Sequence, residues 1–168
     1  MSVARWVMVV VGVMSLAGCG HGSSSGATQT ESKAVVLVPP PNPDDVEAWH
    51  TFMGQALLSV THDPNLHPYS FIVRRGDGPN AQQDRKNQAT AIQMMLKSSV
   101  PPGNMIALTG PDSAKVADVI NEAFKDPSSS MPHGLKVLFV GAPATAEAAR
   151  KAVSAAGAEL QVVAVREP

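Results

Sequence analysis

Two hydrophobic periods alternate along the chain from residue 34 onward. Short aliphatic and β-branched runs typical of strands are separated by longer segments in which apolar residues recur every three or four positions, as in amphipathic helices. The predicted strands are residues 34–38, 69–75, 105–109, 136–140 and 160–165. The predicted helices are residues 44–60, residues 80–97, one beginning at Ser113, and one that Thr145 caps and that ends at Gly157.

This order, β-α-β-α-β-α-β-α-β, predicts a single three-layer α/β domain with a mostly parallel five-stranded sheet. The runs 105–109 and 136–140 are apolar almost throughout, so we expect them at the centre of the sheet. The runs 69–75 and 160–165 carry polar or charged residues and are expected at its edges. A flavodoxin-like strand order, 2-1-3-4-5, satisfies these assignments.

The N-terminal segment, up to Cys19, forms a separate pattern. Arg5 precedes an uncharged run that extends from Trp6 to Leu16. At ~1.5 Å per helical residue this run is too short to cross a hydrocarbon core of ~30 Å. The run ends in Leu16-Ala17-Gly18-Cys19, which resembles the lipobox of bacterial lipoproteins, and Cys19 is the only cysteine of the chain.

The resemblance implies a signal peptide at residues 1–18 and lipid attachment, with palmitate-type acyl chains, at Cys19. Two or three acyl chains would anchor the protein stably in a membrane. Gly20 stands where inner-membrane lipoproteins of this class have aspartate, so in a two-membrane cell the resemblance implies the outer membrane, facing the periplasm. It extends no further than Cys19 and implies no fold.

A polar segment follows the lipobox. Residues 20–33 are rich in Gly, Ser and Thr and have no large apolar side chain. A flexible chain of this length spans roughly 20 Å root-mean-square. We therefore predict a lipidated flexible tether at residues 19–33 and an α/β domain at residues 34–168.

Composition narrows the class of function. The 168 residues carry a net charge of −1 and only 4% aromatic residues, which argues against nucleic-acid binding. The chain has no glycine-rich phosphate motif, and most residues in the loop 39–45 are prolines without an N–H. No cofactor is predicted.

Two groups of residues are candidates for a functional site. Ligands of α/β folds bind at the carboxyl ends of the strands, where the sequence places Asp44, Asp45, Asp112 and Ser113. The three aspartates could bind a divalent cation; alternatively, they cap helices. The second group is the polar run 80–88, interpreted either as a solvated helix start or as a projecting surface for a partner, formed by Gln82, Gln83, Arg85, Lys86 and Gln88.

These features predict a membrane-tethered envelope lipoprotein that acts as a non-enzymatic binding or assembly module. Its partner would be another periplasmic component, such as part of a secretion, conjugation or pilus apparatus. The alternative is a small-molecule or cation-binding protein, or a hydrolase, that uses the loops at the strand ends. Enzymatic activity is left open, with a non-enzymatic role favoured.

Overall fold

A parallel sheet lies at the centre of the fold in a computed structural model, which describes residues 37–98, 100–126 and 131–166. These residues belong to one unit, Ala34–Pro168. Their strands are paired in the order β1-β2-β3-β4. The strands are β1 (Tyr69–Ile72), β2 (Met105–Thr109), β3 (Lys136–Gly141) and β4 (Glu159–Ala164).

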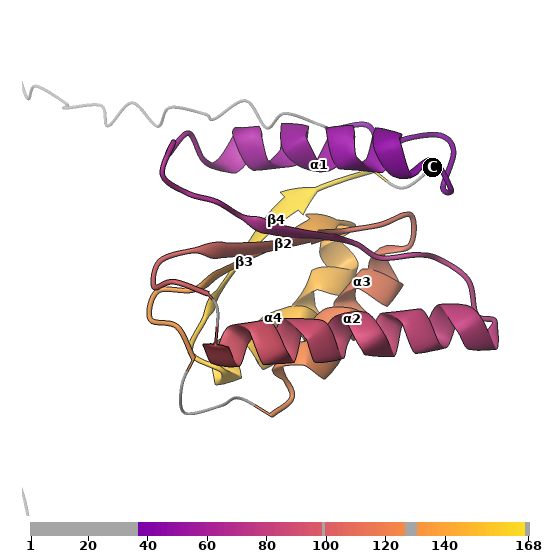
Figure 1. The fold of residues 1–168 in the computed structure, drawn as a ribbon. Coiled ribbons are helices and arrows are strands. Elements are labelled where there is room, and N and C mark those ends of the chain that lie inside the picture. Colours follow the sequence, from indigo (N-terminus) through magenta and orange to yellow (C-terminus); the bar gives the residue numbers. More distant parts are fainter. Residues whose placement is uncertain (1–36, 99, 127–130, 167–168) are drawn as a thin grey trace, which may run out of the picture. The chain divides into compact units, whose positions relative to one another are not determined.

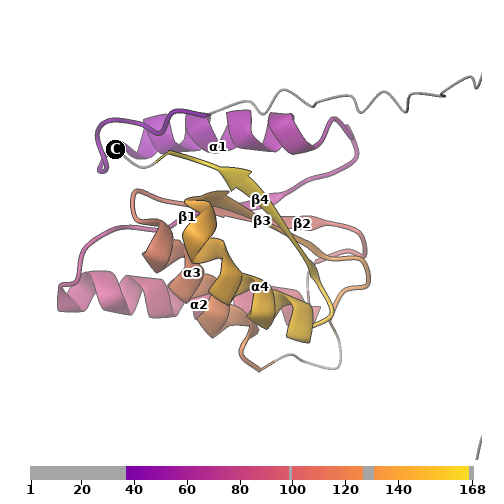
Figure 2. The same cartoon turned by 180° about the vertical axis from the view of Figure 1, so that it is seen from behind.

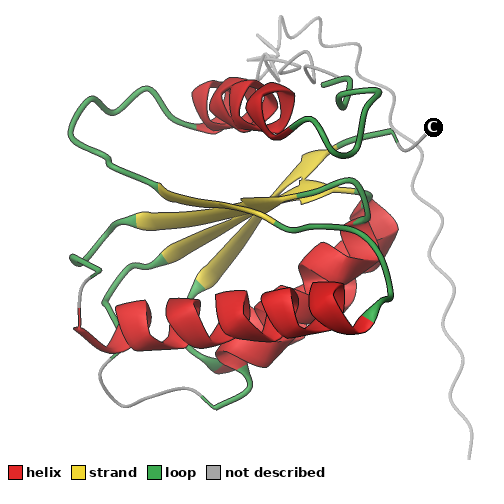
Figure 3. Ribbon diagram, turned by 45° about the vertical axis from the view of Figure 1, so that its right-hand side comes forward, coloured by secondary structure: helices red, strands yellow, loops and turns green. Residues whose placement is uncertain are grey.

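Helices cover both faces of this sheet, which confirms the predicted α/β class with a parallel sheet (Figure 1). The helix α1 (Val46–Val60) lies on one face. The opposite face carries α2 (Pro79–Ser98), α3 (Ser113–Phe124) and α4 (Ala146–Ala155), the last preceded by the 3-10 turn η1 (Pro143–Thr145). Figure 3 shows these layers with the sheet seen edge-on.

The two central strands are buried on both faces, as their apolar sequences predict. Because successive side chains of a strand point to opposite faces, β2 and β3 contribute to two separate cores. Ala107 and Leu138 pack with α1, whereas Leu108 and Phe139 pack with α2, α3 and α4. Every residue of β2 is buried.

The strand order differs from the predicted flavodoxin-like order. The run 69–75, expected to be separated from 105–109 by the first strand, pairs with it directly, with Tyr69 opposite Ile106. Of the predicted strand 34–38, residues 34–36 lie outside the described residues. Leu37 forms one isolated parallel bridge, to Val165 beyond the end of β4. The proline run that begins at Pro39 ends this pairing because proline has no N–H.

The face on which α1 lies follows from this order. The chain steps from β1 to β4 in one direction, and its three crossovers, α2, α3 and α4, lie on the same face (Figure 2). From Leu37 to β1 the chain steps back across the whole sheet. Because parallel crossovers are right-handed, a step in the reverse direction places its helix on the opposite face.

Local signals set most helix ends. Asp45 caps α1 by accepting from the Ala48 N–H at 3.0 Å, and Pro79 begins α2. The prediction that Thr145 caps the last helix is wrong, because its hydroxyl instead donates to the Ala142 carbonyl oxygen at 2.8 Å. Gly157 follows that helix with a φ of +78°, a conformation that favours glycine.

Candidate functional site

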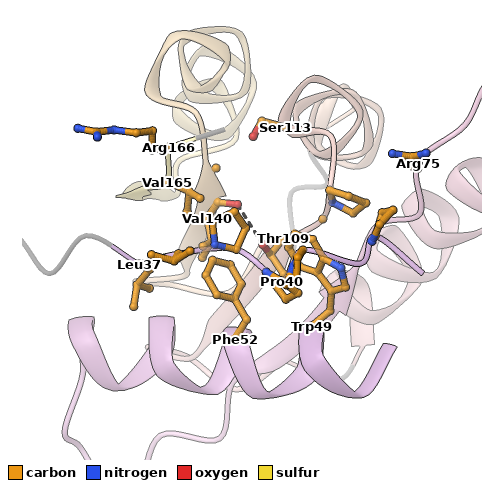
Figure 4. A pocket seen from close by; sticks show the side chains of 17 residues that line it. Leu37, Pro40, Trp49, Phe52, Arg75, Thr109, Ser113, Val140, Val165 and Arg166 are labelled. Carbon is orange, nitrogen blue, oxygen red and sulfur yellow. Dashed lines mark hydrogen bonds between the residues drawn. The ribbon is translucent and has the colours of Figure 1, made fainter. Parts of the chain in front are cut away.

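A pocket of about 560 Å³ opens at the carboxyl edge of the sheet (Figure 4). Its walls come from the ends of β2 and β3, from residues that follow each of the four strands, from the loop 37–43, from α1 and from the first residue of α3. Its lining is Leu37, Val38, Pro39, Pro40, Pro41, Pro43, Trp49, Phe52, Arg75, Thr109, Gly110, Pro111, Ser113, Val140, Gly141, Val165 and Arg166. The position agrees with the general location of ligand sites in open parallel sheets.

Two aromatic residues of α1 line one wall of the pocket. Trp49 and Phe52 pack edge to face, with ring centroids 5.5 Å apart and an interplanar angle of 82°. The indole Nε1 of Trp49 donates to the Asn42 carbonyl oxygen at 3.3 Å, which ties the proline-rich loop to the helix. The wall is therefore apolar and is held on two sides, by the core beneath it and by the loop beside it.

The strand ends opposite are tightly packed. The Thr109 hydroxyl donates to the Val140 carbonyl oxygen at 3.1 Å, and the Ser113 hydroxyl oxygen accepts from the Ala142 N–H at 2.8 Å. Glycine is required at position 141, because a Cβ there would lie 2.6 Å from the Ser113 Oγ and 2.9 Å from the Phe139 ring. Both hydroxyls that line the pocket are thus engaged with the backbone.

Backbone donors are scarce around the pocket. Five lining residues are prolines, which have no N–H. At the start of α3, Asp112 accepts from the Ala114 and Lys115 N–H groups at 3.0 and 3.2 Å. Asp112 therefore occupies two of the first N–H groups of α3, which are groups of the kind with which a helix N-terminus binds phosphate.

Positive charge lies at the mouth. Arg75 and Arg166 are exposed and lie on opposite sides of the pocket (Figure 4). Neither forms an ion pair with any residue that the structure describes. The lining contains these two basic side chains and, within the described part of the chain, no acidic one.

The loop that carries Arg75 is held at several points. Arg85 of α2 donates from Nη1 to the carbonyl oxygens of Arg74 and Gly76, at 3.3 and 2.7 Å. Beyond Gly76, Asp77 forms an ion pair of 2.8 Å with Lys115 of α3. The hydrogen bond from Lys115 and its positive charge hold the pKa of the Asp77 carboxyl below its ordinary value.

The predicted loop residues have separate places in the structure. Ser113 lines the pocket, whereas Asp44, Asp45 and Asp112 do not. Asp45 and Asp112 accept hydrogen bonds from the first N–H groups of α1 and α3, which is the capping arrangement that was the alternative to cation binding. Among residues 37–98, 100–126 and 131–166, no group of three acidic, histidine or cysteine side chains could hold a metal ion.

The predicted partner surface is helical, as expected, but much of it contacts the protein itself. Gln82 donates to the Asp77 carbonyl oxygen and the half-buried Gln88 to that of Ile72, both at 2.9 Å. Arg85 fastens the β1–α2 loop, and Gln83 bonds to Asn87 within the helix. Gln82, Arg85 and Lys86 also line a shallow groove of about 260 Å³, whose other side is Asp118, Val119 and Glu122 of α3.

Sequence reasoning missed the aromatic wall and both arginines. Trp49 and Phe52 have the helical spacing of core residues, and they do belong to a core; what places them at a pocket is the loop 37–43 folding over them. Arg75 and Arg166 are exposed residues near the ends of edge strands and are far apart in the sequence, so no local pattern links them. A cation at the end of each of two predicted parallel strands was the available signal.

Cys19 and the predicted segments 1–18 and 19–33 lie outside the described residues. Within the described part of the chain, no helix combines the length and the apolar character that a membrane crossing requires. Comparison with protein-family models, with curated proteins and with solved structures finds no match to this chain. Functional inference therefore depends on the site itself.

Proposed function

We propose that this protein is a lipid-anchored envelope lipoprotein whose α/β domain binds a small ligand with an apolar body. The pocket at the carboxyl edge of the sheet is the observation that carries the proposal. Its volume of about 560 Å³ falls within the usual range for small-molecule sites, ~300–1,000 Å³. Binding, rather than conversion, is proposed because the Thr109 and Ser113 hydroxyls are hydrogen-bonded to backbone atoms.

The anchor belongs to the same proposal. Acylated Cys19 would be the mature N-terminus and residues 20–33 the tether, in the outer membrane if the cell has two membranes. Leu37 and Val38 line the pocket only a few positions after the tether ends, so the ligand would bind close to a membrane. Metabolic labelling with a fatty-acid analogue should mark the wild-type protein, and label retained on Cys19→Ser would contradict lipidation at this residue.

Tryptophan fluorescence tests the pocket. The chain has two tryptophans, and Trp6 lies in the predicted signal peptide, so Trp49, in the pocket wall, is the tryptophan reporter of the mature lipoprotein. The mature lipoprotein in phospholipid nanodiscs is titrated with decanol, an uncharged probe, with empty nanodiscs in parallel to correct for partitioning. Saturable change of Trp49 emission is expected; its absence would contradict ligand binding in the pocket.

A matched pair of variants locates the binding. Val38 lines the pocket and is 80% exposed, so Val38→Asp should weaken decanol binding with little effect on folding. Val46 is also exposed, at 49%, but lies outside the lining, so Val46→Asp should leave the binding unchanged. Equal effects of the two substitutions would contradict the proposed position.

A protein partner is the second candidate. The observation that favours it is the groove between α2 and α3, with Arg85 and Lys86 on one side and Asp118 and Glu122 on the other. A periplasmic or envelope protein with charges of both signs could dock there. If it does, Lys86→Glu together with Asp118→Lys should abolish its capture from solubilised membranes, and the pocket variant Val38→Asp should not.

A further inference from the structure

We infer that the ligand of the pocket is a single-chain amphiphile with an anionic head, a carboxylate or a phosphate. This inference rests on the proposed function and adds to it the chemical class of the ligand. It follows from three properties of the site: an apolar interior with few donors, a mouth at which the charged lining residues that the structure describes are both basic, and a fixed backbone segment that carries one of the two cations.

The interior suits an acyl chain better than a peptide. A bound peptide brings amide carbonyls that must find donors once water is excluded. Around this pocket five residues are prolines, and the N–H groups of Ala114, Lys115 and Ala142 already donate to Asp112 and Ser113. An alkyl chain has no polar group to satisfy, and it packs against Leu37, Trp49, Phe52 and Val140 without loss of hydrogen bonds.

The mouth determines the sign of the head group. Arg75 and Arg166 are on opposite sides of it. Of the acidic residues nearby along the chain, Asp77 is paired with Lys115, and Asp45 and Asp112 accept from the first amides of α1 and α3. Asp44 is exposed and outside the lining, and Glu167 lies outside the described residues. A ligand head at the mouth therefore meets two cations without a compensating anion in the lining. An anionic head is attracted there and a cationic head is repelled.

Arg75 is mounted on a fixed segment of backbone. Arg85 bonds the carbonyl oxygens on both sides of it, and Val73, at the start of the same segment, donates its N–H to the Thr109 carbonyl oxygen at 2.8 Å. Gly110 lies so close to Val73 that a Cβ at position 110 would collide with the carbonyl oxygen of Val73. The backbone that carries Arg75 to the mouth is thus already ordered, so binding a ligand there does not require the loop to be ordered first.

The decisive comparison uses probes that share one alkyl chain. Decanoate, decyl phosphate and decylammonium are titrated into the mature lipoprotein in nanodiscs of uncharged lipid, with Trp49 emission as the readout. Decanoate and decyl phosphate should bind more tightly than decylammonium. Each of Arg75→Gln and Arg166→Gln should weaken the binding of the anions by about two- to fivefold, the usual size for exposed charge pairs.

Two controls make the test specific, and a comparison of the two anions identifies the head group. Arg74→Gln removes the same charge from the neighbouring exposed position outside the lining and should leave the anion preference intact. Salt at about 1 M should reduce the preference, because it shortens the screening length to ~3 Å. Preference for one anion over the other distinguishes a fatty-acid head from a phosphate head.

Each outcome decides one of the two proposals. Equal binding of decanoate and decylammonium, or an anion preference that survives the double variant Arg75→Gln/Arg166→Gln, overturns the inference. If either of these results is obtained but decanol still binds, the proposed function stands and only the inference of an anionic head is lost. If neither decanol nor the charged probes change Trp49 emission, the proposed function and the inference both fail. Tighter binding of a peptide with an apolar carboxyl terminus than of decanoate would also overturn the ligand class.

Discussion

Arg85 Nη1 lies 2.7 Å from the carbonyl oxygen of Gly76, to which it donates a hydrogen bond. The same nitrogen bonds the carbonyl oxygen of Arg74 at 3.3 Å, so one guanidinium holds both neighbours of Arg75. Arg85, which the sequence alone assigned to a candidate partner surface, therefore positions the backbone of Arg75 at the mouth of the pocket.

The first prediction concerns this positioning role. Arg85→Gln should weaken decanoate binding although Arg85 is outside the lining of the pocket, and it should lower the free energy of unfolding by about 1 kcal/mol through lost hydrogen bonds. Fluorescence titration and urea unfolding measure the two effects. Lys86→Gln, with the same loss of charge one position away, is the control; an identical response of both variants would show that net charge alone is responsible.

The second prediction separates two glutamines of the same polar run. Gln88 is half-buried and donates to the Ile72 carbonyl oxygen at 2.9 Å, so Gln88→Ala should destabilise the fold by about 1 kcal/mol. Gln83 is exposed and bonds only within its helix, so Gln83→Ala should change stability by less than about 0.5 kcal/mol. Urea unfolding measures both. Loss of partner capture in the Gln83 variant at unchanged stability would support docking on α2.

The third prediction concerns the aspartates at the helix starts. Asp45→Ala and Asp112→Ala should each cost about 0.5–2 kcal/mol, because each removes an acceptor for the first N–H groups of a helix. Asp45→Asn and Asp112→Asn retain an acceptor and should cost less. Thermal unfolding with a divalent cation or with a chelator should show no difference; stabilisation by the cation that both alanine variants lose would restore the cation-binding alternative.

The fourth prediction is a pH profile. Lys115 holds the pKa of Asp77 below its ordinary value of ~3.9. The contribution of the ionised Asp77 to the free energy of unfolding is therefore present above about pH 4 and is lost as the pH falls through the lowered pKa. The hydrogen bond to Asp77 and its charge raise the pKa of Lys115 above ~10.4, so that contribution is present below about pH 10 and lost as the pH rises through the raised pKa.

Urea unfolding of the wild type and of Asp77→Asn across the pH range tests this. The stability difference between them should be constant from about pH 5 to 9 and shrink at both extremes. Lys115→Gln should give the same profile, and the double variant should lose no more free energy of unfolding than either single variant. A difference that persists at acid pH would show that Asp77→Asn acts through something other than this ion pair.

Much of the fold could be predicted from local patterns. The runs 105–109 and 136–140 are apolar at successive positions, which only a strand covered on both faces accommodates, and they are the two central strands. Helix starts could be predicted for a similar reason: Asp45 and Asp112 act on N–H groups two or three positions away, so the interaction is contained in a short stretch of sequence.

The edge position of Leu37 could not be predicted in this way. A short β-branched run has the same propensity beside any strand, and the bridge to Val165 joins the two ends of the described part of the chain. That pairing, with the right-handed crossover rule, sends α1 to the face opposite the other three helices. Trp49 and Phe52 thereby line one pocket together with the loop 37–43, the ends of β2 and β3, and the residues that follow β4.

In the candidate site, too, some features could be predicted from local sequence and others depend on the tertiary structure. Residue types along the chain were enough to predict that the loop 39–45 is poor in donors and that a candidate site would lie at the carboxyl ends of the strands, because proline chemistry and strand direction are local properties. The pocket itself, its aromatic wall and the two arginines at its mouth depend on contacts between distant segments. Packing free energy selects such contacts over the whole domain at once, so no single stretch of sequence specifies them.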